Sequence, residues 1–272
     1  MESSEVERQD GLVISSRSNA RVKQLRAAFA GQARLSGGLV AIEGDNLLGE
    51  ALRSGMVFKT IFVSAGRKTS DNVLTLIPKG VEVVWLSEDV FASVVETQSP
   101  QGVAALLVPP VWAFEDMLHG TPLVLVAAGL QDPGNFGTLV RSAEAFGASG
   151  VLMMPGTVSA WNPKALRASA GSVFRVPVVP GAVGTLLELK TRGVRLLAAV
   201  TQHEDALEAP LANLVSGCAV MIGNEGAGLS DELREMADVR VSIPCPGKVE
   251  SLNAAVAGSL LLYEASRQRR AR

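Results

Sequence analysis

Five polar side chains in or beside glycine-rich loops are the residues of this sequence best suited to chemistry. They are Asn135, Arg141, Glu225, Ser251 and Asn253. The loops span residues 129–137, 223–231 and 244–253, and none of them contains a histidine. A Ser–His–Asp or Cys–His nucleophile therefore cannot be assembled from them. Amides, a guanidinium, a carboxylate and a hydroxyl suit the orientation and hydrogen bonding of a substrate better than covalent catalysis.

The glycines of these loops indicate a pocket for a small molecule. Glycine permits close approaches that other residues cannot make, so each loop can present backbone N–H and C=O groups to a ligand. In an open parallel sheet, such loops meet beyond the carboxyl ends of strands. Each loop alone is weak evidence, because Asp-Pro-Gly-Asn at 132–135 is also an ordinary turn. Neither a dinucleotide fingerprint nor a Walker motif is present, which disfavours nicotinamide and nucleoside-triphosphate chemistry.

The second half of the chain, from Thr121, repeats one unit of apolar strand, glycine-rich loop and helix. Such alternation predicts a mostly parallel sheet. We expect strands at 123–128, 150–154, 176–179, 195–200, 219–222 and 239–243. We expect helices at 138–147, at 164–170 and from Leu252 onward. The last helix has an apolar stripe at helical spacing, predicted to face the core, of Leu252, Ala255, Val256, Leu260 and Tyr263.

The first half of the chain predicts a smaller α/β unit. A helix at 15–30 has serine and asparagine residues available as N-caps. We expect strands at 39–42, 60–63, 81–85 and 103–108, and helical stretches at 45–54 and 70–77. Two consecutive prolines then open a mixed stretch that we interpret as a linker. The sequence thus predicts an α/β protein with a domain at 1–108, a linker at 109–120 and a second domain at 121–272.

Charge is unevenly distributed along a chain whose net charge is only −2. Three stretches, 11–42, 145–187 and 265–272, contain no acidic residue but hold twelve of the 25 lysines and arginines. Clustered cations are typical of proteins that bind a polyanion, which predicts RNA or DNA as a partner. The alternative is that these are ordinary solvated faces, with the C-terminal arginines complementing a helix dipole.

Composition disfavours several classes of protein. Two cysteines, Cys218 and Cys245, and two distant histidines, His119 and His203, predict neither a disulfide framework nor a metal site. The acidic, polar first ten residues are unlike a signal peptide, and no apolar run approaches the roughly 20 residues needed to cross a bilayer. We therefore expect a cytoplasmic protein with no membrane partner and no bound metal.

Three ordered segments carry a resemblance to a known family: LQDPGNFGTLVRSAEAFG at 130–147, MIGNEGAGLSDEL at 221–233 and IPCPGKVESLNAAVAGSLLLYEA at 243–265. With KALRASAGSVFRVPV at 164–178, they resemble the SpoU/TrmH branch of the SPOUT RNA ribose methyltransferases. Residues 15–107 more loosely resemble the family's N-terminal substrate-binding domain, which is related to a ribosomal RNA-binding protein. That match lies in SxxNxxVKxLR at 16–26, Ile42-Glu43-Gly44 and SPQGVAAL at 99–106.

The resemblance implies S-adenosylmethionine as cofactor, methylation of a ribose 2′-hydroxyl, a homodimer and a SPOUT fold. That fold is a trefoil-knotted, mostly parallel C-terminal sheet, here preceded by a smaller α/β RNA-binding domain. Threaded chains are rare in proteins, so the expected knot rests on the resemblance alone. We expect ribosomal RNA as substrate because of the N-terminal domain. The alternatives are transfer RNA, or a non-catalytic RNA-binding or ribosome-assembly factor on the same fold.

The resemblance also implies roles for the five polar residues. Arg141 is expected at the acceptor hydroxyl, as general base or as a group that orients ribose and phosphate. A guanidinium is an awkward base because it normally stays protonated. Asn135 and Asn253 are expected to place ribose and phosphate, and Ser251 either joins them or caps the last helix. Glu225 is expected to hold Asn135 or Arg141, within the chain or across a dimer interface, or only to stabilise a turn.

Other residues complete the expected binding sites. Cofactor contacts are expected mainly from the backbone, near Ile222, Gly223, Ile243 and Leu252. Phosphate contacts are expected from the N-terminal helix and from a second group nearer the active site. These residues are Arg17, Asn19, Arg21 and Lys23 in the first group, and Lys164 and Arg167 in the second. Phosphate contacts position RNA without reading its sequence.

Overall fold

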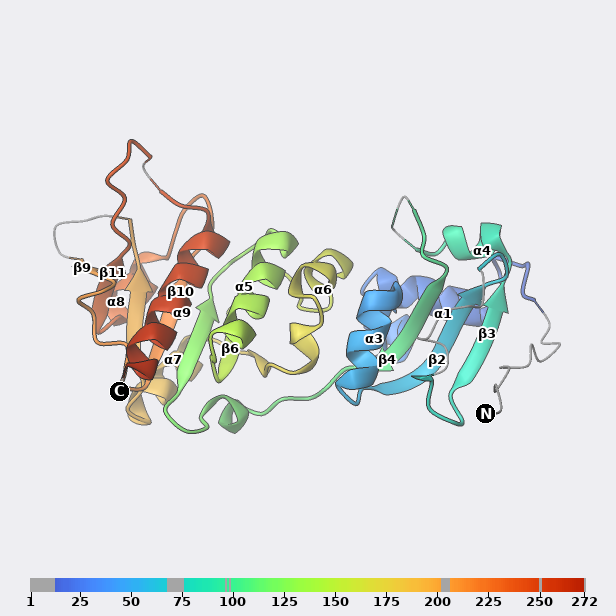
Figure 1. Ribbon diagram of the computed structural model, residues 1–272, viewed down its shortest axis with the longest axis horizontal. Coiled ribbons are helices and arrows are strands. Elements are labelled where there is room, and N and C mark those ends of the chain that lie inside the picture. The colour runs from blue at the N-terminus through green and yellow to red at the C-terminus, as the bar shows by residue number, and fades with distance from the viewer. Residues whose placement is uncertain are drawn as a thin grey trace. The chain divides into compact units, whose positions relative to one another are not determined.

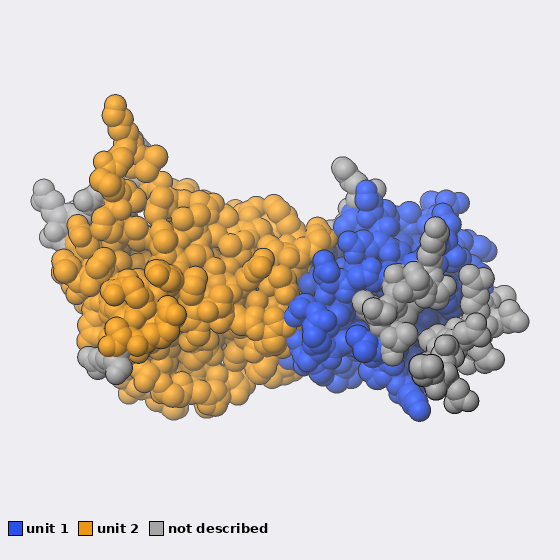
Figure 2. All heavy atoms as spheres, viewed as in Figure 1, with its two compact units in different colours: residues 1–110, 161–163 blue, residues 111–160, 164–272 orange. Residues whose placement is uncertain are grey.

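The chain folds into two compact units, each with a sheet of its own (Figure 1). The structure is a computed structural model and describes residues 13–67, 76–95, 97, 99–201, 206–249 and 251–271. One unit comprises residues 1–110 with 161–163, and the other comprises residues 111–160 with 164–272 (Figure 2).

The first unit is built on a mixed four-stranded sheet with the strand order β1-β4-β2-β3. Its strands are β1 (Val40–Glu43), β2 (Val57–Ser64), β3 (Glu82–Leu86) and β4 (Val103–Val108). Strand β4 pairs antiparallel with both β1 and β2, whereas β2 and β3 are parallel. Its helices are α1 (Ala20–Phe29), α2 (Ala33–Ser36), α3 (Asp45–Arg53) and α4 (Glu88–Ala92). Leu25 of α1 and Phe91 of α4 pack with Phe62 in the core of one sheet face.

Helix α1 is shorter than the helix expected at 15–30. It begins at Ala20 because Asn19 is its N-cap, whose side-chain oxygen accepts the backbone N–H of Arg21 at 2.9 Å. Asparagine side chains compete for backbone N–H groups and therefore favour the position before a helix. Arg17 and Asn19 consequently precede α1 rather than lying in it. The helix expected at 70–77 lies outside the described residues except at 76 and 77.

The second unit contains a seven-stranded sheet in the order β7-β6-β5-β10-β8-β11-β9, and every neighbouring pair is parallel. Its strands are β5 (Leu123–Ala127), β6 (Gly150–Met153), β7 (Val178–Pro180), β8 (Arg195–Ala199), β9 (Leu207–Glu208), β10 (Cys218–Ile222) and β11 (Val239–Ser242). The expected α/β fold with a mostly parallel sheet is confirmed, and the knot stays a prediction. Strands β5 and β10 are wholly buried and pair with each other although they are far apart in the sequence.

Helices cover both faces of this sheet (Figure 1). They are α5 (Pro133–Ala145), α6 (Pro163–Ser169), α7 (Val183–Thr191), α8 (Asp231–Met236) and α9 (Ala254–Arg270), with short 3₁₀ turns η2 (Phe114–Met117) and η3 (Ser172–Phe174). Side chains alternate between the two faces of a strand. Val124 and Val126 of β5 therefore share a core with residues of α7 and α8. On the opposite face, α5 and α9 lie side by side.

The linker expected at 109–120 is partly structured. Residues 114–117 form η2, and Met117 is fully buried in the core of the second unit. Phe114 and Leu118 pack against the same core. Their apolar side chains gain more from burial than from exposure to water. This part of the expected linker therefore belongs to the second unit.

Helix α5 begins earlier than expected, inside the loop at 129–137. Asp132 is its N-cap, and the Asp132 carboxylate accepts the backbone N–H of Asn135 at 2.8 Å. Pro133 occupies the first helical position, where its fixed φ is favourable and its missing N–H is not needed. The Asp-Pro pair thus starts a helix rather than a turn. Asn135 lies in the first helical turn, and Arg141 lies nearly two turns further along the same helix.

Helix α9 contradicts most of the expected core stripe, although Ala255 of that stripe is buried. Val256, Leu260 and Tyr263 are 47%, 43% and 46% exposed, and Leu252 precedes the helix. The buried face consists instead of mostly small residues: Ala254, Ala255, Gly258, Leu261, Leu262 and Ala265. Small residues face inward because α9 lies very close to α5. A Cβ added to Gly258 would be 2.4 Å from Cδ2 of Leu139.

Close packing of α5 on α6 generates a test of the fold. A Cβ on Gly137 would lie 2.3 Å from the Ala165 carbonyl oxygen and 2.7 Å from Cβ of Ala168. Gly137→Ala should therefore lower the free energy of unfolding by about 1–3 kcal/mol in urea denaturation. The matched control is Gly184→Ala in α7, where no atom lies within 4 Å of the added Cβ. That control should be neutral or stabilising by up to about 1 kcal/mol, and equal losses in both variants would contradict the packing argument.

Candidate active site

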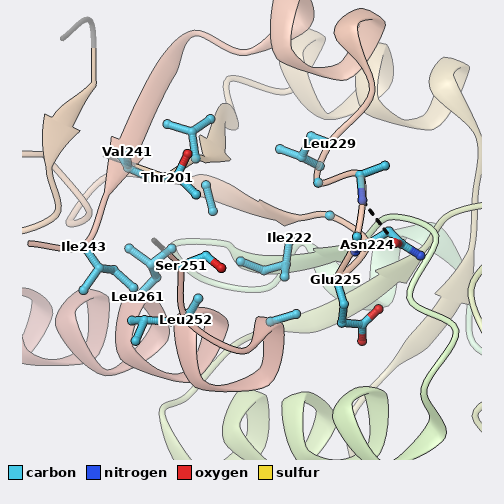
Figure 3. Close-up of a pocket in the computed structure, with 18 of the residues that line it drawn as sticks. Thr201, Ile222, Asn224, Glu225, Leu229, Val241, Ile243, Ser251, Leu252 and Leu261 are labelled. Atoms are coloured by element: carbon cyan, nitrogen blue, oxygen red, sulfur yellow. Dashed lines mark hydrogen bonds between the residues drawn. The ribbon is translucent and has the colours of Figure 1, made fainter. Parts of the chain in front are cut away.

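A pocket of about 390 Å³ opens at the carboxyl ends of β8, β10 and β11 in the second unit (Figure 3). The residues expected at a cofactor all line it: Ile222, Gly223, Ile243 and Leu252. Leu261 of α9 adds to the apolar wall, and the backbone of residues 223–229 lines another side. A volume of about 300–1,000 Å³ with apolar walls and a few polar groups is typical of small-molecule sites.

The loop 223–229 is folded back on itself, and Asn224 is the residue that holds it. Its backbone N–H and C=O pair with Gly228, and its side-chain oxygen accepts the N–H of Gly226 at 2.8 Å. Its side-chain amide donates to the carbonyl of Gly129 at 2.9 Å, which ties this loop to the loop after β5. A Cβ on Gly223 would lie 2.2 Å from the carbonyl carbon of Gly228, so only glycine fits there. Asn224 was not among the residues expected from the sequence, although its place between Gly223 and Gly226 was a signal.

Two side-chain hydrogen bonds connect three of the expected polar residues. The Asn253 side-chain amide donates to the side-chain oxygen of Asn135 at 3.1 Å. The Asn135 amide in turn donates to Oε1 of Glu225 at 2.7 Å. Glu225 also lines the pocket, so this polar network lies at the pocket's edge. The contact between Glu225 and Asn135 is made within one chain.

Asn253, and not Ser251, is the N-cap of α9. The Asn253 side-chain oxygen accepts the backbone N–H groups of Ala255 and Val256, at 2.9 and 3.2 Å. The alternative in which Ser251 caps the helix is therefore wrong. Ser251 lines the pocket instead, between Ile243 and Ile222 in Figure 3.

Arg141 stands apart from this network. Its side chain is exposed, and it forms no hydrogen bond or ion pair with any residue that the structure describes. It is also absent from the described lining of the pocket. Its guanidinium is therefore available to a polyanionic partner that reaches α5 from solvent.

Lys164 is paired with the cap of α5. Its ammonium lies 3.0 Å from the Asp132 carboxylate, and both side chains are partly exposed. The backbone N–H of Asn135, and secondly Lys164, hold the pKa of Asp132 below its ordinary value. The charged cap is therefore present at neutral pH and is lost as the pH falls through that lowered pKa. Arg167, one turn along α6, is exposed and has no partner among the described residues.

A family model described as the SpoU rRNA Methylase family matches residues 122–263. The chain belongs to this family. It is 36% identical over 253 residues to the 23S rRNA (guanosine(2553)-2′-O)-methyltransferase RlmP of Bacillus subtilis (strain 168), covering 92% of this chain and 97% of that protein. The resemblance stated from the sequence motifs is confirmed, and this SpoU-family chain is an enzyme, an RNA methylase.

Two solved structures share the architecture of this SpoU-family chain. The SpoU methyltransferase AviRb from Streptomyces viridochromogenes, in complex with the cofactor AdoMet, gives a TM-score of 0.83 at 28% identity, over 93% of this chain and 98% of that chain. The AdoMet-bound rRNA methyltransferase from Sinorhizobium meliloti gives 0.81 at 27% identity, over 94% and 97%. Both neighbours span nearly the whole of this chain, so the likeness includes its two units.

The first unit matches a second family model, the MRM3-like substrate binding domain, over residues 19–105. In this unit Arg17 and Lys23 are exposed and have no partner in the described part of the chain. Arg21 is instead paired with Glu82 at 2.8 Å, and the side chain of Asn19 is used to cap α1. Of the four residues expected to bind phosphate here, two are therefore already engaged within the protein.

The described residues also bear on metal binding and on membrane spanning. No group of three or more His, Cys, Asp or Glu side chains there could hold a metal ion. No helix in that part of the chain has the length and apolar character needed to cross a membrane.

The double role of Asn253 can be separated by substitution. Asn253→Ala removes both the cap of α9 and the donation to Asn135, and should cost about 1 kcal/mol of unfolding free energy. Asn253→Asp keeps a good cap, so its stability should stay close to that of the parent protein. Its carboxylate cannot donate a hydrogen bond to Asn135, which removes that contact alone. Urea denaturation measures both variants. Equal losses would show that the bond to Asn135, and not the cap, carries the stability.

Proposed function

We propose that this SpoU-family enzyme transfers a methyl group from S-adenosylmethionine to a ribose 2′-hydroxyl of ribosomal RNA. The observation that carries the proposal is the hydrogen-bonded network of Asn253, Asn135 and Glu225 at the edge of a small-molecule pocket. The exposed Arg141 lies on the same helix as Asn135. RlmP, whose name states a 2′-O-methyltransferase of 23S rRNA, supports the reaction and the substrate.

The pocket fits S-adenosylmethionine. Apolar side chains of Ile222, Ile243 and Leu252 can sandwich an adenine, whose two faces are apolar. Gly223, Gly226 and Gly228 of this wall carry no side chain, so backbone groups beside them can bind polar edges. The two AdoMet-bound neighbours named above support this assignment. We propose that Ile222, Gly223, Ile243 and Leu252 hold the cofactor.

Methyl transfer is an in-line displacement, so the enzyme's main task is alignment. When bound, the cofactor supplies an electrophilic methyl group on a sulfonium. Alignment of two reactants can contribute on the order of 7–11 kcal/mol. The Asn135 amide is fixed at both ends, by Asn253 and Glu225, and can therefore hold the acceptor ribose in one orientation. Ser251, which lines the pocket, can join it as a hydroxyl donor.

Arg141 is proposed as the residue at the acceptor nucleotide. A guanidinium is a donor and binds phosphate in a bidentate manner, which suits orientation of the sugar–phosphate backbone. As a base it would first have to give up a proton, for which the phosphate of the substrate is a suitable acceptor. As a base it would then accept the 2′-hydroxyl proton, whereas in the orienting role that proton leaves toward the phosphate or solvent. Lys164 and Arg167 lie on the adjacent helix α6 and are proposed to contact neighbouring phosphates.

A homodimer is proposed from the outward face of α9. Val256, Leu260 and Tyr263 form an exposed apolar stripe there, and Tyr263 packs edge-to-face on Phe146 at 5.6 Å between ring centroids. Exposed apolar stripes of this kind mark sites where another protein binds. A second copy of the same face would cover it symmetrically.

Residues 1–108 are proposed as the RNA-binding domain and 121–272 as the methyltransferase domain. The linker at 109–120 joins them, and its residues 114–118 pack in the second unit. The substrate-binding model that matches 19–105 supports this division. Ribosomal RNA as substrate supports a cytoplasmic location for the enzyme.

The proposed reaction can be tested with purified enzyme and methyl-labelled S-adenosylmethionine. Label should appear in unmodified ribosomal RNA, at a nucleotide whose 3′ linkage has become resistant to alkali. Label in transfer RNA alone would contradict the substrate, and no label in either would contradict the reaction.

Arg141→Ala is the decisive variant in that assay. It should lower methyl transfer by at least about 100-fold, as loss of a group at the reacting atoms does, while binding of S-adenosylhomocysteine by calorimetry is retained. Arg192→Ala, an exposed cation of the same unit paired with Glu188, is the matched control and should keep parental activity. Parental turnover in Arg141→Ala would remove Arg141 from the site.

The RNA-binding proposal predicts which cations of the first unit set the salt dependence. Arg17→Ala with Lys23→Ala should reduce the slope of log affinity against log salt by about 0.7–0.9 per cation, because each phosphate contact releases a counterion. The control pair is Arg21→Ala with Arg53→Ala, whose side chains are already paired with Glu82 and Glu50. Filter binding to ribosomal RNA over a salt series measures the slopes. The same slope for the parent and the first pair would make Arg17 and Lys23 bystanders.

A further inference from the structure

Arg234 lines the pocket but takes no part in the network of Asn135, Asn253 and Glu225. Among the described residues that line the pocket, Arg234 is the one cation and Glu225 is the one anion. A pocket that bound only the apolar parts of a ligand would not need an arginine in its wall. A cation in the wall of a small-molecule pocket indicates an anionic group on the ligand.

The two charges come from different elements. Glu225 belongs to the loop after β10, whereas Arg234 belongs to α8, which packs against β8. A ligand that carries unlike charges at separate positions can therefore meet each of them in one orientation.

S-adenosylmethionine carries charges of this kind. Its sulfonium and ammonium groups are positive, and its amino-acid carboxylate is its one anionic group. The reacting sulfonium belongs near Glu225, because Glu225 holds Asn135 at the proposed acceptor site. The carboxylate then requires a cation elsewhere on the wall. We propose that Arg234 binds the amino-acid carboxylate of the cofactor, an inference that rests on the proposed function.

The present partner of Arg234 does not prevent this. Arg234 is ion-paired with Asp231 one turn earlier in α8, and the two side chains are 43% and 85% exposed. Exposed pairs of this kind contribute little free energy, so the guanidinium can bind a second carboxylate or exchange one for the other. An arginine fork matches the two oxygens of a carboxylate.

Calorimetry with two ligands tests the assignment on the full chain. S-adenosylhomocysteine has the amino-acid carboxylate, whereas 5′-methylthioadenosine shares the adenosine and the sulfur but lacks the amino-acid group. Arg234→Ala should weaken binding of S-adenosylhomocysteine by about tenfold, the size expected for loss of one charge-assisted contact, and leave binding of 5′-methylthioadenosine within about twofold. Arg234→Lys should retain part of the affinity, because it keeps the charge without the fork.

Two controls separate carboxylate binding from support of α8. Asp231→Ala breaks the same ion pair but keeps the cation, so its affinity for S-adenosylhomocysteine should equal or exceed that of the parent. Arg192→Ala removes a paired, exposed arginine at the C-cap of α7 and should change the affinity for neither ligand. Equal weakening of both ligands by Arg234→Ala, no weakening of either, or an Asp231→Ala variant as weak as Arg234→Ala would each overturn the proposal. A parent protein that binds neither ligand would instead contradict the proposed function.

Discussion

The hydrogen bonds from Asn253 to Asn135 and from Asn135 to Glu225 join three loops that are distant in the sequence. A side-chain amide can donate from its nitrogen and accept at its oxygen at the same time. The two hydrogen bonds therefore run in one direction, from Asn253 through Asn135 to Glu225. Glu225 can only accept when ionised, and it therefore ends the series. The Asn253 oxygen is meanwhile occupied by the first N–H groups of α9. Each amide is thus held in one orientation at the edge of the pocket.

These loops meet because of the order of strands at the centre of the second sheet. Strand β10 is placed directly beside β5, and the Ala128 N–H donates to the Ile222 carbonyl just where both strands end. The loops that carry Asn135 and Glu225 therefore leave the sheet side by side. Helix α9 then returns over the same two strands. Gly258 allows it to approach α5 closely enough for Asn253 to reach Asn135.

Periodicity predicted six of the seven strands described in the second unit to within two residues, because their apolar runs are buried in the sheet. It missed β9, whose two residues are exposed. Periodicity did not predict the first residue of the helices that begin at a capping side chain. Asn19, Asp132 and Asn253 each start a helix at a position that composition alone allows equally to a turn. The stripe on α9 failed for another reason: its inward face was decided by small residues that permit close packing. The contact between Glu225 and Asn135 was expected from the family resemblance, whereas periodicity alone could not predict contacts among the loops, since they depend on strand order.

Whether the cations of the basic stretches can bind RNA also depends on the fold. Arg21, Lys164 and Arg175 come from stretches without acids, yet each is paired with an acid from elsewhere: Glu82, Asp132 and Glu144. The guanidinium of Arg269 is occupied in a different way, by the backbone carbonyls of residues 121, 122, 214 and 216. A cation that is already paired with an acid neutralises RNA phosphates less effectively, so it releases fewer counterions from the RNA. Affinity for RNA phosphates should therefore follow where the fold places acids, and not the number of cations in a stretch.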